Sequence, residues 1–216
     1  GALVVTRKAW EGMSPAGQTA LREAASQVEF FAEEVTDLEA INADQIVVAA
    51  GANTASLLAG MPVRAVKGEI LRLRRRPSAP PPPTRTVRGS VHGRPIYLVP
   101  RGDGLVVGAT QHETGRDTQV TVAGVRDLIA DAERLMPSIG EYELHECSAG
   151  LRPVSPDGLP VIGRISDRVI VASGHGRNGI LLTPITADSV SALLAGDVLP
   201  EAKAADPSRF EKVAHP

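Results

Sequence analysis

The chain has 216 residues and a formal net charge of −2, which is enough length for one large domain or for two lobes that share an interface. The near-neutral charge excludes the broad basic field that holds a nucleic-acid backbone, because the arginine run at 72–76 is short. No stretch approaches the roughly 20 apolar residues that span a bilayer, and the first residues lack the regions of a signal peptide. We therefore expect a soluble, cytoplasmic protein that binds neither nucleic acid nor membrane.

Cysteine and histidine usage argues against a metal site. Cys147 is the only cysteine, which excludes an intramolecular disulfide and a multi-cysteine site and fits a reducing compartment. Its simplest interpretation is a buried, inert thiol. The histidines lack the i, i+4 pairing of a helical metal site, so we expect no metal. They are His92, His112, His145, His175 and His215.

The first part of the chain predicts an α/β layer. Ser14 is a plausible helix N-cap and Pro15 suits the first helical position. A continuous apolar run that ends in Gly51 is typical of a strand buried on both faces. The expected elements are a helix over 14–26, an extended segment over 28–31, strands over 34–38 and 43–51, and a short helix over 52–58.

The middle of the chain predicts an antiparallel meander with a covering helix. Residues 66–74 alternate apolar and charged, which is the period of a half-exposed antiparallel strand. The segment 77–83 holds five prolines, cannot join a sheet ladder and should form a stiff, solvated loop. The other expected elements are strands over 86–91, 95–99, 105–108 and 142–149, and a helix over 120–136 that Pro137 ends.

A strand over 169–172 and a helix over 180–195 return the chain to the α/β layer. This order predicts two lobes, with the antiparallel sheet inserted into an α/β layer that both ends of the chain contribute. A ligand would lie between the lobes. No G-x-G-x-x-G turn follows a strand near the start of the chain, so the usual first phosphate-binding turn of a dinucleotide fold is not predicted. This indicates a fragment, or a chain from which segments are missing.

The stretch Gly174–Pro184 predicts a glycine-rich turn between a buried strand and a helix. Its glycines permit a sharp turn or a close approach of a ligand to the backbone. The amides and dipole at the helix N-terminus would favour an electron-rich ligand edge. A tight turn without a ligand explains the pattern equally well.

Two side chains could bind a carboxylate. Arg152 follows an apolar strand and precedes a proline-rigid loop, where its planar guanidinium could meet a carboxylate bidentately. Its simpler alternative is a structural ion pair with Asp157 or another acid. Tyr97 lies on a meander strand, and its hydroxyl could donate to the same ligand or its ring could serve sheet packing.

Six motifs follow one another in the chain, at Ala43–Ala52, Val66–Leu73, Ile96–Arg101, Val106–Thr110, Ala149–Gly163 and Gly174–Pro184. Together they resemble the glycine oxidases of the thiamine biosynthesis pathway, within the D-amino acid oxidase superfamily. The resemblance runs from about Glu33 to about Gly196. Several spaced motifs in the same order are far more specific than any one of them, and they favour the carboxylate-binding interpretation of Arg152.

The resemblance implies an FAD-dependent oxidoreductase in which Arg152 binds the substrate carboxylate, Tyr97 assists it and Arg177 reaches the active site. Related sarcosine oxidases attach their flavin to a cysteine near the position of Leu151 and Arg152, but Cys147 precedes that point here. We therefore expect non-covalent FAD. The implied FAD contacts are Val35, Ala50, Gly51, Gly174, His175, Gly176, Arg177, Asn178, Gly179, Ile180 and Leu181.

The implied fold class is α/β plus α+β, namely the C-terminal part of an FAD-binding Rossmann-like domain with an inserted antiparallel-sheet substrate domain. Residues 1–60 would contribute to both lobes, 61–147 would form the substrate domain with its covering helix, 148–200 would complete the FAD-binding domain, and 201–216 would form a tail.

The implied reaction is oxidative deamination of glycine or a similar small amino acid to an imine with release of hydrogen peroxide, for thiazole synthesis. The family tends to form homo-oligomers. Two alternatives stay open. One is a D-amino acid or sarcosine oxidase or dehydrogenase with the same anchor. The other is a fragment or partner subunit that cannot hold FAD alone.

Overall fold

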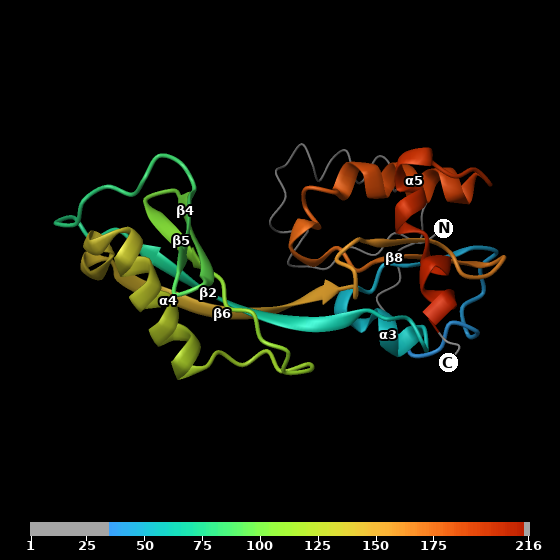
Figure 1. Cartoon of the computed structure of the whole chain (residues 1–216), viewed down its shortest axis with the longest axis horizontal. Coiled ribbons are helices and arrows are strands. Elements are labelled where there is room, and N and C mark those ends of the chain that lie inside the picture. Colours follow the sequence, from blue (N-terminus) through green and yellow to red (C-terminus); the bar gives the residue numbers. More distant parts are fainter. Residues whose placement is uncertain (1–34, 214–216) are drawn as a thin grey trace.

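The computed structural model describes residues 35–213, with side chains up to Phe210, and shows two lobes at opposite ends of an elongated molecule (Figure 1). One lobe holds a three-stranded sheet and the other holds a five-stranded sheet. This two-lobed mixed α/β arrangement confirms the predicted fold class. The helix predicted over 14–26 and the extended segment over 28–31 lie outside the described residues.

The smaller sheet has the strand order β1-β8-β7. Strands β1 and β8 run parallel, while β7 and β8 form an antiparallel hairpin. Apolar side chains from β7 and β8 pack against helix α5 and the C-terminal segment. The elements of this lobe are β1 (Ile46–Val48), η1 (Gly51–Asn53), α3 (Thr54–Leu57), β7 (Val161–Arg164), β8 (Val169–Ser173), η3 (Gly176–Asn178), α5 (Thr183–Leu194), η4 (Pro200–Ala205) and η5 (Pro207–Val213).

The larger sheet is antiparallel, with the order β3-β4-β5-β2-β6. Helix α4 covers one face and packs on fully buried side chains, among them Leu71, Leu98 and Val107. This confirms the predicted meander and covering helix. The elements are β2 (Arg64–Arg74), β3 (Val87–Val91), β4 (Arg94–Arg101), β5 (Gly104–Gly108), α4 (Val122–Leu135), η2 (Pro137–Glu141) and β6 (Glu143–Val154).

The first half of β2 differs from the predicted half-exposed strand. Lys67 and Glu69 are 1% and 0% exposed, although the alternation places charged residues there on a solvated face. Their side chains lie 3.7 Å apart at the N-terminal end of α4. The prediction failed because helix α4 and the loop before it cover the face on which these two residues lie.

Three further elements depart from the prediction. Residues 35–38 do not form a strand in the described structure, so the candidate strand over 34–38 is wrong there. Strand β6 continues to Val154 and therefore includes Arg152, which the sequence placed after the strand. Strand β7 was missed, because its short run of four residues lies between a proline-rich loop and a polar turn.

Strands β2 and β6 pair from Arg64 to Arg74 and run side by side from one lobe to the other (Figure 1). Beyond this ladder, Val154 at the end of β6 forms an antiparallel bridge with His175. Thus β6 connects the larger sheet directly to the turn after β8. It also crosses the expected domain boundary between 147 and 148.

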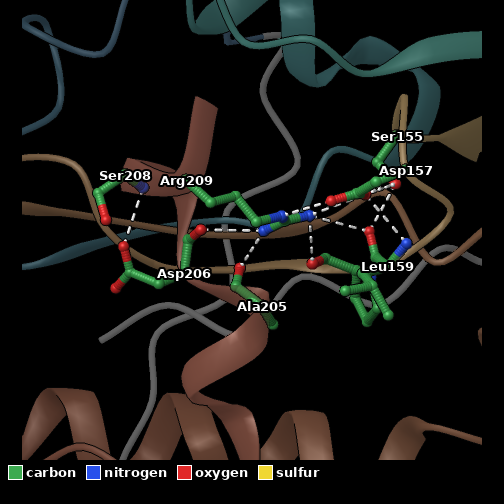
Figure 2. Close-up of polar contacts among 8 residues, drawn as sticks. Ser155, Asp157, Leu159, Ala205, Asp206, Ser208 and Arg209 are labelled. Carbon is green, nitrogen blue, oxygen red and sulfur yellow. Dashed lines mark hydrogen bonds and ion pairs between the residues drawn. The ribbon is translucent and has the colours of Figure 1, made fainter. Parts of the chain in front are cut away.

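The segment after α5 packs on the smaller lobe through Arg209, as Figure 2 shows. The guanidinium donates to both carboxylate oxygens of Asp157, at 2.8 and 3.2 Å, and to the carbonyls of Leu159, Pro160, Ala205 and Asp206. Arginine hydrogen bonding lowers the pKa of Asp157 to about 2. Arg209 therefore joins the segment after α5 to the loop between β6 and β7.

Candidate active site

The carboxyl ends of β1 and β8 meet because the two strands run parallel, with Val48 opposite Val171. Each strand leads into a turn that begins with a glycine in the left-handed region: Gly51 has φ of 56° and Gly174 has φ of 74°. The fully buried Thr54 joins these turns, since its hydroxyl contacts the Gly51 carbonyl and the Ser173 hydroxyl, both at 2.8 Å. The structure thus brings Ala50 and Gly51 together with the Gly174 turn.

The turn after β8 has two parts. Residues 176–178 form the short helix η3, and α5 begins only at Thr183, later than the predicted start at Ile180. The side chain of His175 is fixed by Thr186, at 2.9 Å from its Nε2. Because the Thr186 hydroxyl donates to the Leu182 carbonyl, it accepts from His175. Burial lowers the pKa of His175, which favours this neutral form.

The outer side of this turn is open to solvent. Ile180 and Leu181 are 93% and 77% exposed, which is unusual for adjacent large apolar side chains. Arg177 is also exposed. An apolar ridge beside glycine-rich backbone fits the flat face of an aromatic ligand, so these residues form a plausible wall for one.

Arg152 lies on β6 opposite Val66 of β2. Its guanidinium lies flat over Gly68, where any Cβ atom would overlap it. The predicted alternative, an ion pair with Asp157, is wrong, because Asp157 is paired with Arg209. Among the described residues, the one hydrogen-bond partner of the Arg152 side chain is the Thr110 carbonyl, at 3.2 Å. The other guanidinium donors have no partner in the part of the chain that the structure describes, and their geometry suits an anionic ligand.

Tyr97 repeats this arrangement on β4. It lies opposite Gly108 of β5, and its ring covers that glycine so closely that a Cβ would lie 2.6 Å from the ring Cζ. Opposite residues in antiparallel register point to the same face. Across the sheet, Tyr97 is paired with Gly108, Gly108 with Ile70, and Ile70 with Ser148. Ser148 and Arg152 point to the same side of β6 because an even number of positions separates them, so Tyr97 and Arg152 lie on the same face of the sheet.

The face that carries Tyr97 and Arg152 is the one that α4 does not cover. The residues between the two side chains include Gly108, Gly68 and Gly150, together with Ile70 and Ser148. The sequence motifs contain these glycines, but the roles of Gly68 and Gly108 were missed because only the strand register shows that each lies beneath a functional side chain. The result is a shallow surface with an arginine on one strand and a phenol on another.

Cys147 points to the opposite face. It is half-buried and packs with the core beneath α4, and burial raises the pKa of its thiol. A thiol in this place is protonated and faces away from Arg152. The thiol is therefore poorly placed to react with a group on the arginine side of the sheet.

Two predicted site residues are not brought to this surface by any contact in the described structure. Val35 is 41% exposed at the start of the described chain, and Arg177 points into solvent from η3. Their predicted roles stay predictions. Within residues 35–213, no three His, Cys, Asp or Glu side chains cluster as metal ligands, and no helix is long and apolar enough to cross a membrane.

Residues 4–193 match the family of FAD-dependent oxidoreductases known as DAO, so the chain belongs to that family. The chain is 41% identical over 161 residues to the bifunctional protein ThiO/ThiG of Nostoc sp., a match that covers 74% of this chain and 24% of that protein. It is 38% identical over 151 residues to the glycine oxidase of Geobacillus kaustophilus, covering 67% of this chain and 38% of that one.

The crystal structure of the Geobacillus kaustophilus glycine oxidase superposes with a TM-score of 0.77 and 32% identity, covering 90% of this chain and 57% of that chain. The predicted family resemblance is thereby confirmed. The chain spans about a quarter of the length of the ThiO/ThiG protein and 38% of the glycine oxidase.

FAD is the cofactor of this family, and the described residues fit the flavin-ring side of such a site. The glycine turns at Gly51 and Gly174 meet at one sheet edge, and the exposed pair Ile180 and Leu181 offers an apolar contact surface. Within the described residues, strand β1 is not followed by a G-x-G-x-x-G turn, so the fit that these residues show is to the ring side.

Proposed function

We propose that this chain forms the substrate-binding part and the flavin-facing wall of an enzyme that oxidises glycine or a similarly small amino acid to its imine. The observation that carries this proposal is Arg152, whose guanidinium lies over Gly68 with donors available to a carboxylate. Arg152 lies two residues before Val154, which bridges to His175 in the cofactor turn. Strand β6 therefore links the carboxylate anchor to the cofactor turn.

Each side chain has a defined task in this proposal. Arg152 binds the substrate carboxylate through paired, charge-assisted hydrogen bonds. Tyr97 donates its hydroxyl proton to the same carboxylate from the neighbouring part of the face. Gly68 and Gly108 let these two side chains lie close to the sheet, because any Cβ there would overlap them. Arg177 would reach the substrate from the cofactor turn.

The cofactor would be held by Ala50 and Gly51 on one side and by residues 174–181 on the other, with Val35 towards its adenine. FAD held there would supply the two-electron oxidation: the substrate loses its Cα hydride and one amine proton to become the imine, and oxygen takes up the two electrons and two protons as hydrogen peroxide. The protein contributes position: the bound carboxylate fixes the orientation of the Cα–H bond. The imine would serve thiazole synthesis in thiamine biosynthesis, in a cytoplasmic enzyme that forms homo-oligomers.

The intact protein tests this proposal. With FAD bound, it should release peroxide when glycine is added. Arg152→Ala should raise the KM for glycine by roughly 10- to 150-fold, the equivalent of one charge-assisted hydrogen bond, while FAD content is unchanged. A matched control is Arg126→Ala, because Arg126 lies on the exposed surface of α4. An unchanged KM in the Arg152 variant would show that this residue is not the anchor.

The substrate comparison separates the alternatives. Glycine, sarcosine and D-alanine should be assayed side by side, with oxygen and with an artificial electron acceptor. Preference for sarcosine or D-alanine would identify the related oxidase or dehydrogenase, and a colourless, inactive protein would favour a partner subunit that does not hold FAD alone.

Non-covalent binding of FAD is a separate part of the proposal, supported by the position of Cys147 beneath α4. Acid precipitation should release the yellow colour into the supernatant. Colour that stays with the precipitated protein would contradict this part.

A further inference from the structure

Thr110 connects the candidate anchor to Glu69, a buried residue on the other face of the sheet. The Thr110 carbonyl accepts from Arg152 Nη1 at 3.2 Å. The Thr110 hydroxyl lies between two groups of Glu69, since it accepts from the Glu69 backbone N–H at 2.9 Å and donates to the Glu69 carboxylate at 3.3 Å. One residue therefore contacts both the anchor and the buried acid.

This arrangement leaves the Thr110 carbonyl available to Arg152. Opposite residues of an antiparallel pair normally exchange two backbone N–H···O bonds. Thr110 donates its N–H to the Glu69 carbonyl at 3.2 Å, but the returning bond from the Glu69 N–H goes to the Thr110 hydroxyl. The side chain thus replaces the carbonyl as acceptor, and the carbonyl can turn to the guanidinium.

Glu69 is itself held firmly. Its carboxylate accepts from the backbone N–H of Thr121, the N-cap of α4, at 2.8 Å, where the helix dipole favours a negative charge. The buried Lys67 lies 3.7 Å from the same oxygen and donates to Asp117 at 2.5 Å and to the Gln119 carbonyl at 2.9 Å. A buried pair is stable only when its polar groups are satisfied in this way, so the position of the Glu69 side chain is well determined.

We propose that Thr110 is a positioning residue for Arg152: its hydroxyl bonds to Glu69 leave its carbonyl to hold the guanidinium over Gly68, ready for a substrate carboxylate. This inference rests on the proposed function, because it requires Arg152 to be the anchor. Without the hydroxyl, the Glu69 N–H would compete for the Thr110 carbonyl and Arg152 would lose its one protein partner among the described residues.

The test uses the intact, FAD-containing protein and two small probes, acetate and its neutral counterpart acetamide, with binding followed by flavin absorbance. Thr110→Val should raise the Kd for acetate on the order of 10-fold, the effect of one hydrogen bond to a charged group, and leave the Kd for acetamide unchanged. Thr110→Ser, which keeps the hydroxyl, should restore acetate binding to within about twofold of the original value, well inside one such bond. The KM for glycine should rise in the valine variant more than kcat falls.

A merely structural role for Thr110 predicts another pattern. If the valine and serine variants bind acetate equally well, or if acetate and acetamide weaken together, Thr110 does not position Arg152. Thr110→Ala supplies the same comparison with a smaller side chain should the valine variant fold poorly. Arg152→Ala separates the two proposals: if it weakens acetate binding while Thr110→Val does not, only the Thr110 inference fails, and if it leaves acetate binding unchanged, the anchor is wrong and both fail.

Discussion

The glycine beneath Arg152 offers the sharpest test of the site geometry. In Gly68→Ala, the added methyl group would overlap Nη1, Nη2 and Cζ of Arg152, so the guanidinium must leave its place above β2. Gly68 does not have a positive φ, and alanine in a strand interior is favoured over glycine by roughly 0.5–1 kcal/mol. The substitution should therefore disturb the anchor without unfolding the protein.

The expected loss follows from the contacts that the guanidinium would make. Charge-assisted hydrogen bonds contribute about 1.5–3 kcal/mol each, so losing the equivalent of one such bond should raise the KM for glycine by roughly 10- to 150-fold. Steady-state peroxide production measures the KM, and urea unfolding measures stability, which should change by less than about 1 kcal/mol.

Gly150→Ala is a matched control for this experiment. Gly150 lies directly opposite Gly68 on β6 and on the same face, but a Cβ there meets nothing within 4 Å. Its KM should stay within about twofold of the original, well below the effect of one charged hydrogen bond. If the two substitutions change the KM for glycine equally, or if Gly68→Ala has a normal KM, then glycine binding does not depend on the position of the Arg152 guanidinium over Gly68.

Two further predictions concern stability. Arg209→Ala should lower the free energy of unfolding at pH 7 by about 1 kcal/mol: the pKa of Asp157 near 2 corresponds to roughly 2 kcal/mol, which the 37% exposure of its side chain reduces. A carboxyl group whose pKa is lowered by folding stabilises the folded protein above its unfolded-state pKa, and this stabilisation is lost as the pH falls towards its folded-state pKa. Urea titrations should therefore show the difference in unfolding free energy between the original protein and the variant becoming smaller between pH 4 and pH 2. A difference that stays constant over this range would contradict the assignment of the pKa shift to Arg209. Leu71→Ala removes a fully buried side chain beneath α4 and should lower the free energy of unfolding by about 2–5 kcal/mol in the same assay. The KM for glycine should stay near normal, because Leu71 lies on the face of the sheet opposite to Arg152. A large rise in KM without a loss of stability would show that the two faces do not act separately.

Much of the fold could be predicted because its local signals are strong. The apolar run before Gly51, the alternating pattern of β2 and the helical stripe of α4 each indicate one type of element, and all three elements are present. Strand β1 is shorter than predicted, at Ile46–Val48, and Val47 is 37% exposed, so burial on both faces was wrong there. The buried state of Lys67 and Glu69 could not be predicted, since it depends on a helix that begins at Val122, far along the chain. The alternation of apolar and charged residues indicates a strand, but it does not show which other element will cover that strand.

The candidate site divides in the same way. The glycine-rich turn and Arg152 stand out as motifs, and family resemblance suggested their roles. The contributions of Gly68 and Thr110 were not visible, because they arise from register across β2, β5 and β6 and from a hydroxyl that replaces a carbonyl. Such relations join residues that are distant in sequence, and no short motif encodes them.

The continuous pairing of β2 with β6 has a consequence for how this protein can diverge. A ladder without an interrupting loop sets the spacing between Arg152 and the turn at His175, so neither can drift without breaking main-chain hydrogen bonds. Strands β3 and β4 lie at the far edge of the sheet and take no part in that ladder. Substitutions on the outer strands can therefore change the side chains on this face without altering the main-chain pairing that links Arg152 to the His175 turn.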